Sequence, residues 1–228
     1  MKKHFFPTEL AYIFGIVLLA LGTAFMEAAD FGVSMVVAPA YLLHLKLSQI
    51  LPFFTFGMAE YSLQAVLLLL LIAVLRKFKI SYLFSFVTAV LYGMVLDLNM
   101  AAVSLIPCET VPVRVIFYIV GLLLCSVGVS MFFHTYISPE VYELFVKEAS
   151  TKFHVDIHKF KTVYDCVSCV TGILMSFLFF GFGQFEGVKF GTILCALING
   201  WTIGQCTALL ERFFDFRDGW NLRRFFEK

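Results

Sequence analysis

Five of the acidic and amide residues within the long apolar stretches of this sequence could bind an ion, a proton or a polar solute. They are Asp97, Asn199, Gln205, Glu60 and Asp165. An ionisable side chain at the centre of a bilayer costs about 2.5–3.5 kcal/mol, so each one requires an explanation. We interpret all five as candidate substrate-binding residues, with Asp97, Asn199 and Gln205 ranked first.

Structural interpretations of these residues compete with the functional one. Asp97 could contact an ion or make a hydrogen bond between helices, and the sequence favours neither. Asn199 is interpreted first as a hydrogen bond between helices, because an amide can bond there without carrying a charge. Glu60 and Asp165 lie near the ends of their stretches, where water could solvate them. Lys161 lies one helical turn before Asp165 and predicts an ion pair.

The composition identifies the elements that must position these residues. Of 228 residues, 61% are hydrophobic and 14% are charged, whereas soluble domains have about 45–50% and about 25%. A soluble or disordered chain is therefore excluded. Six apolar runs are each long enough to cross a bilayer core of about 30 Å: 10–29, 56–75, 83–105, 115–137, 163–183 and 190–210. We expect an all-α fold, a polytopic membrane helix bundle that forms one transmembrane domain over 1–228.

Basic residues indicate the orientation of this domain. All 17 Lys and Arg residues except Lys46, Arg114 and Lys189 fall on one side of the six-helix topology. The positive-inside rule places that side, with both termini, in the cytoplasm. Residues 212–228 form a basic aromatic tail, which we expect to bind anionic lipid and not nucleic acid.

Small residues recur in the apolar runs at matched positions. The third run carries Ser85, Ala89 and Gly93, and the sixth carries Thr192, Ala196, Gly200 and Gly204, with an offset of 107 residues. Gly15 and Gly22 match Gly121 and Gly128 with an offset of 106, and Glu60 matches Asp165 with an offset of 105. Small residues are common in membrane helices and align by chance, but three helix pairs in the same order favour a duplication.

A duplication of three helices predicts two inverted repeats, because the second copy enters the membrane from the opposite side. Repeat 1 covers about 8–106 and repeat 2 about 112–211. Since small residues let helices approach closely, we expect the third and sixth helices to pack at the centre, facing each other.

A short extra segment follows the first helix of each repeat. Residues 31–45 are apolar and broken by Gly32 and Pro39, which predicts a re-entrant or interfacial half-helix. Ser138 and Pro139 predict the start of an amphipathic helix, which we expect on the cytoplasmic surface of the membrane.

Motifs of enzymes and metalloproteins are not found in the sequence. It has no GxGxxG, P-loop, G-x-S-x-G or H-E-x-x-H pattern, and no nucleophile and base pair is visible. Only Cys108 lies outside the apolar runs, so no disulfide is expected. We expect no enzymatic activity, no cofactor and no metal site.

Three segments resemble the YitT/YczE-like (YczE/YyaS/YitT) family of bacterial integral membrane proteins. They are 31–34 together with 39–42, the run Tyr-Gly-Met-Val-Leu-Asp-Leu at 92–98, and 186–193 with its Gly-Thr-Ile. The similarity extends over most of 8–206. It implies a multi-pass protein of the bacterial cytoplasmic (inner) membrane with a duplicated architecture.

Two functional hypotheses follow. The first is a secondary-transporter-like permease for a small solute or ion, which predicts a water-reachable polar cavity near Asp97 and Asn199. The alternative is a non-transporting membrane partner or assembly factor of another membrane or biosynthetic system, in which these residues are paired with their neighbours. The lipid bilayer is a partner in both, and homo-oligomerisation is left open.

Overall fold

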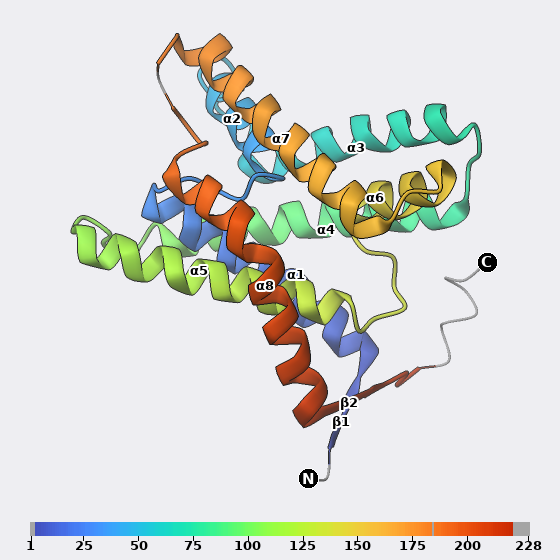
Figure 1. Ribbon diagram of the computed structural model, residues 1–228. Helices are drawn as coiled ribbons and strands as arrows, with labels where there is room; N and C mark the ends of the chain where they lie inside the picture. The colour runs from blue at the N-terminus through green and yellow to red at the C-terminus, as the bar shows by residue number, and fades with distance from the viewer. Residues whose placement is uncertain (1–2, 184, 221–228) are drawn as a thin grey trace.

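Helices form most of the described chain. The computed structural model describes residues 3–183 and 185–220, without the side chains of 157 and 158 (Figure 1). The elements are β1 His4–Pro7, α1 Thr8–Ala29, α2 Ala38–Leu47, α3 Phe56–Leu75, α4 Ile80–Val103, α5 Val111–Phe132, α6 Val141–Phe153, α7 Ile157–Phe180, α8 Phe190–Phe213 and β2 Phe214–Arg217.

Six of these helices are long and apolar enough to cross a membrane: α1, α3, α4, α5, α7 and α8. They correspond to the six predicted runs, so the prediction of an all-α, multi-pass membrane protein is confirmed at this level. The bounds differ by a few residues. For example, α5 begins at Val111, where Pro112 is tolerated because the first turn needs no backbone donor.

The central helix pair consists of α1 and α5, which share the largest interface in the protein. Gly15 lies against Gly128, and Gly22 lies against Gly121; a Cβ added to Gly22 would be 2.6 Å from the Gly121 carbonyl oxygen. These glycines let the two backbones approach closely. The prediction that the third and sixth helices occupy the centre is therefore wrong.

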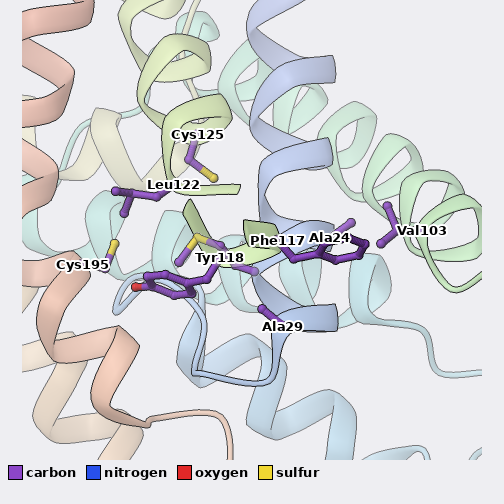
Figure 2. Close-up of a cluster of buried hydrophobic side chains, with 9 residues drawn as sticks. Ala24, Ala29, Val103, Phe117, Tyr118, Leu122, Cys125 and Cys195 are labelled. Carbon is purple, nitrogen blue, oxygen red and sulfur yellow. The ribbon is translucent and has the colours of Figure 1, made fainter. Parts of the chain in front are cut away.

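Apolar and aromatic side chains fill the space beside this crossing, as Figure 2 shows. Phe117 and Tyr118 of α5 pack with Ala24 of α1, Val103 of α4 and Cys195 of α8. The Tyr118 hydroxyl donates to the Gly191 carbonyl at 2.5 Å. This cluster attaches the first turns of α8 to the central pair.

Small residues of α4 pack as predicted. Ser85 and Ala89 are fully buried, and Gly93 lies against Gly57 of α3. The α3–α4 hairpin is closely packed at this point, because a Cβ on either glycine would overlap the opposite backbone.

The matching residues of α8 behave differently. Thr192 is buried, and its hydroxyl donates to the Val33 carbonyl at 2.7 Å. Ala196, Gly200 and Gly204 are exposed, and in the described structure no atom lies within 4 Å of a Cβ added to either glycine. Close packing of these three residues within the chain was predicted and is not found, because α8 packs on α5 through its other face and diverges from α7 (Figure 1).

Both short helices are packed inside the protein. α2 contacts α3 and α7, and its Lys46 donates to the Phe179 carbonyl at 3.2 Å. α6 contacts α3, α4 and α7, and its Lys152 donates to the Val74 carbonyl. The expectation that the amphipathic helix lies on the membrane surface is corrected, because its apolar face is covered by α3 and α7.

A parallel strand pair joins the two ends of the chain, with His4 opposite Phe214 and Pro7 opposite Arg217. Glu9, at the start of α1, accepts hydrogen bonds from the backbone N–H groups of Gly219 and Trp220 at 3.0 and 2.8 Å. The two ends therefore lie on the same side of the helices, as an even number of spans requires. Of the predicted tail 212–228, residues 221–228 lie outside the described residues.

Candidate functional site

Asp97 holds the start of α3. Its Oδ2 accepts from the Thr55 hydroxyl at 2.6 Å, and its Oδ1 accepts from the Gly57 backbone N–H at 2.8 Å. Thr55 is the N-cap of α3, and its hydroxyl oxygen also accepts from the Met58 N–H. Asp97 thus makes a hydrogen-bonded contact between helices, the structural one of its two interpretations.

Asn199 and Gln205 lie on α8, apart from the α3–α4 hairpin that carries Asp97. Asn199 is half-buried and Gln205 is exposed. The hydroxyl contacts of α8 with α5 come from other residues, since Ser126 donates to Thr202 at 2.9 Å. The structure does not bring the three first-ranked candidates together.

Asp165 is held by the predicted ion pair. Lys161 Nζ lies 3.7 Å from Asp165 Oδ1 and 3.0 Å from Glu143 Oε1 of α6. The lysine links α7 to α6 and compensates two acids at once. Asp165 is therefore paired with a basic side chain of its own helix.

Glu60 lies in a buried polar cluster that sequence reasoning did not assemble. Its side chain is fully buried, and its Oε2 accepts from the Tyr142 hydroxyl at 2.9 Å. Gln64, one turn further along α3, donates through Nε2 to Glu60 Oε2 at 3.5 Å and to Glu140 Oε2 at 3.2 Å. Two carboxyl groups from α3 and from the start of α6 thus meet around one amide.

Gln64 has only one orientation that fits its neighbours. The backbone N–H of Val141 donates to Gln64 Oε1 at 3.0 Å. Because the carbonyl oxygen of the amide is occupied by this donor, the NH₂ group must face Glu60 and Glu140. The first turn of α6 therefore fixes the amide that bridges the two acids.

Glu140 is the N-cap of α6, and its segment is attached to α4. The Thr88 hydroxyl donates to the Ser138 carbonyl at 2.9 Å, two residues before Glu140. Burial raises the pKa of Glu140 well above its usual range, the nearby Glu60 raises it further, and the hydrogen bond from Gln64 only partly offsets these effects. Burial of this carboxyl group favours its neutral form.

One oxygen of each acid has no hydrogen-bond partner among the described residues: Glu60 Oε1 and Glu140 Oε1 are buried and unsatisfied. Buried polar atoms are satisfied in the great majority of cases, so two unsatisfied carboxyl oxygens in one cluster require an explanation. We define Glu60, Gln64, Glu140 and Tyr142 as the acid cluster.

The depth of the acid cluster follows from the register of α6 along α3. Val141 lies beside Gln64, and Lys152 lies beside Val74. The two helices therefore run in parallel for about 15 Å, at 1.5 Å per residue. The acid cluster lies at the deep end of α6, and Lys152 lies at the end of α3.

Two well-formed cavities lie among the described residues, and neither is lined by Asp97, Asn199 or the acid cluster. A cavity of about 420 Å³ lies at the chain ends and is lined by Thr8, His134, Tyr136, Arg217 and Asp218, among others. Neither of these two is the water-reachable cavity expected near Asp97 and Asn199.

A smaller cavity lies between Glu27 and Gly187, near Asp30. Asp30 pairs with Lys189 at 2.5 Å and with Arg114 at 2.7 Å. These ion pairs connect the end of α1 with the starts of α5 and α8.

Metal ligands do not gather in this structure. Among the described residues, no group of three or more His, Cys, Asp or Glu side chains could hold a metal ion. The six cysteines are free.

Comparison with known proteins gives one match. Residues 6–208 match the family described as "Family of unknown function (DUF6198)". The chain belongs to the DUF6198 family. No match was found among curated proteins or among solved structures. The resemblance of this DUF6198 protein to the YitT/YczE-like family stays a prediction, since the family match does not test it.

Sequence reasoning missed Gln64, Glu140 and Tyr142 although two signals were present. Glu60 and Gln64 are four residues apart and must share a helix face. Glu140 follows Pro139 in a segment interpreted as a turn, and only the packing of α6 on α3 shows that this carboxyl group is buried.

Proposed function

We propose that this DUF6198 protein is a secondary-transporter-like permease for a small solute. The observation that carries the proposal is the acid cluster, in which two buried carboxyl groups from α3 and α6 meet with one unsatisfied oxygen each. Ionisable residues buried within membrane proteins typically belong to ion, proton or substrate pathways.

Contacts of α1 with α5 support the inverted repeats that the proposal requires. Gly15 matches Gly121 and Gly22 matches Gly128, both with an offset of 106. In the structure, Gly15 contacts Gly128 and Gly22 contacts Gly121. This exchange of partners is the pattern of a two-fold axis, in which residue i contacts j and j contacts i.

The short helices give a second, independent argument. α2 of the first half packs on α7 of the second, and α6 of the second half packs on α3 of the first. Their lysine contacts also match: Lys46 bonds to Phe179 and Lys152 bonds to Val74, with offsets of 106 and 105. Two half-helices that cross between repeats are typical of inverted-repeat transporters, whose sites lie where the repeats meet.

The acid cluster lies at such a boundary, because α3 belongs to the first half and α6 to the second. A relative movement of the halves would separate Glu60 from Glu140 and open this position to water or to a solute. Alternating access of this kind uses one site and two arrangements of the same halves.

A thermal-stability screen tests the proposal. Purified wild-type protein in detergent is heated with members of a broad solute library, and Glu60→Gln is measured beside Glu109→Gln, which removes an exposed loop carboxylate. We expect a solute that raises the midpoint of unfolding of wild type and of Glu109→Gln but not of Glu60→Gln. No stabilising solute across the library, or equal shifts in all three proteins, would count against a permease.

A non-transporting membrane partner is the second candidate function, and the exposed face of α8 favours it. Gly200, Gly204 and Gln205 are exposed there, and no atom of the described structure lies within 4 Å of a Cβ added to either glycine. Cross-linking of single-cysteine variants on this face in native membranes would detect a neighbouring protein there, and its absence would leave the face to lipid.

A further inference from the structure

We infer that Glu60 and Glu140 form a proton-binding site, in which both carboxyl groups carry a proton while α6 covers α3. Proton binding by this site does not depend on the proposed function. The use of the site in transport, with the proton as the coupling ion, rests on the proposed function. The site is defined by two buried carboxyl groups, from α3 and from the start of α6, that meet around the amide of Gln64.

No described basic side chain forms an ion pair with either of these two acids. None of the ion pairs between described residues includes Glu60 or Glu140. Lys161 approaches α6 but pairs with Glu143 and Asp165. Two buried, adjacent negative charges without a counter-ion are strongly unfavourable, and protonation removes both charges.

The other titratable groups around the pair come from five helices; four of the six are phenols and one is a thiol. They are Tyr12 of α1, Tyr92 of α4, Cys125 of α5, Tyr142 and Glu143 of α6, and Tyr164 of α7. Tyrosine is neutral near pH 7, and Glu143 is paired with Lys161. The surroundings therefore supply hydrogen-bonding hydroxyl groups but no positive charge.

The orientation of Gln64 favours a proton over a metal cation. Its NH₂ group points to Oε2 of both acids, because the Val141 N–H occupies its carbonyl oxygen. An NH₂ group carries partial positive charge and would repel a cation at this position, whereas Na⁺ or K⁺ requires several oxygen ligands directed at one point. Protonated carboxyl groups need no such shell.

The same contacts describe how the protons could leave. The first turn of α6 carries Glu140 and Tyr142, while Glu60 and Gln64 belong to α3. If α6 moves away from α3, both carboxyl groups lose the protein that buries them, gain water, and release their protons to it. The site is then charged when open and neutral when closed.

Infrared spectroscopy of the purified protein tests this inference directly. A protonated carboxylic acid has a carbonyl stretching band that is separate from the bands of a carboxylate. Spectra of wild type are compared with Glu60→Gln, Glu140→Gln and the control Asp97→Asn, whose carboxylate bonds to Thr55 and lies outside the acid cluster. We expect an acid band in wild type near pH 7 that each Gln variant reduces and that Asp97→Asn leaves unchanged.

The midpoint of thermal unfolding, measured as a function of pH, gives a second test that is independent of the infrared spectra. Because the pKa of Glu140 is raised in the folded state, its contribution to stability is full at acidic pH and is lost as pH rises through the folded pKa. We expect wild type to lose stability at alkaline pH more steeply than Glu140→Gln.

Two results would overturn the inference. One is an acid band that neither Gln variant changes. The other is stabilisation of wild type, but not of Glu60→Gln, by NaCl or KCl relative to choline chloride at equal ionic strength, which would identify a metal-cation site. If both Gln variants fail to fold, loss of the acid band from wild type at alkaline pH still tests the inference, and a band that persists unchanged would contradict it. The solute screen can fail while this test succeeds, so the two proposals are separable.

Discussion

Substitution of Gly22 by alanine should weaken the central helix pair. A Cβ at this position would lie 2.6 Å from the Gly121 carbonyl oxygen, 2.6 Å from Cys125 Sγ and 2.7 Å from the Cys125 backbone nitrogen. Two of these atoms belong to the backbone of α5 and cannot move alone, so α1 and α5 must separate. Gly200 is the matched control, because nothing lies within 4 Å of a Cβ there.

The two substitutions should change the free energy of unfolding in opposite directions. Overpacking a tight contact costs about 1–3 kcal/mol, and alanine in a helix returns about 1 kcal/mol relative to glycine. With rigid backbone atoms in the contact, the cost of Gly22→Ala lies near the upper value, for a net loss of about 2 kcal/mol. Gly200→Ala gains up to about 1 kcal/mol. The difference between the variants is about 3 kcal/mol.

Thermal unfolding of both variants in the same detergent measures this difference. For a chain of this length, 1 kcal/mol corresponds to about 2–4 °C, so the midpoints should differ by about 6–12 °C. Equal midpoints would refute the close α1–α5 crossing. A lower midpoint for Gly200→Ala than for wild type would show that another molecule packs against α8.

Three further substitutions test contacts at the helix ends. Thr55→Val removes the N-cap hydroxyl of α3 and a donor to Asp97, and should cost about 0.5–2 kcal/mol in thermal unfolding. The control Thr110→Val should have little effect, because the side chain of this N-cap of α5 makes no capping hydrogen bond. Glu9→Ala removes the acceptor of three hydrogen bonds, from the Tyr136 hydroxyl and from the backbone N–H groups of Gly219 and Trp220, and should cost about 1–3 kcal/mol, measured in the same way. Partial burial raises the pKa of Asp30, but hydrogen bonds and charges from Lys189 and Arg114 outweigh burial, so the pKa is lowered overall. Wild type should therefore have a higher free energy of unfolding than Asp30→Asn above about pH 4, and this difference should disappear as pH falls through the lowered pKa. A difference between these two proteins that does not change with pH would contradict that assignment.

Hydropathy was sufficient to predict the six long helices, because the thickness of a bilayer sets their length directly. The start of α5 moved by four residues because apolarity does not define a helix end. The strand pair β1–β2 was not predicted, since four-residue strands carry almost no periodicity and their partners are more than 200 residues apart.

The contacts between helices were less predictable than the positions of the helices in the sequence, and Gly93 and Gly200 show why. Both lie in ladders of small residues at matched positions, yet Gly93 contacts α3 and Gly200 contacts no other helix in the described structure. A row of small residues on one helix face shows that another helix can approach closely there, but the path of the loops decides which helix does so.

The acid cluster illustrates a different limit. Counting residues along α3 placed Glu60 near a helix end, where solvation was a reasonable expectation. The count could not include α6, which comes from a distant part of the chain and whose first turn packs beside Glu60 and Gln64. For Asp97 the sequence allowed either binding of an ion or a hydrogen bond between helices. A single sequence does not show which partner is present, whereas the structure shows hydrogen bonds to Thr55 and Gly57.

The strand pair at the chain ends has a consequence for biosynthesis. β1 precedes all six long helices in the sequence, and β2 follows the last of them. His4–Pro7 must therefore remain without its partner strand until all six helices have been synthesised. Pairing of the two strands then links the start of α1 directly to the end of α8.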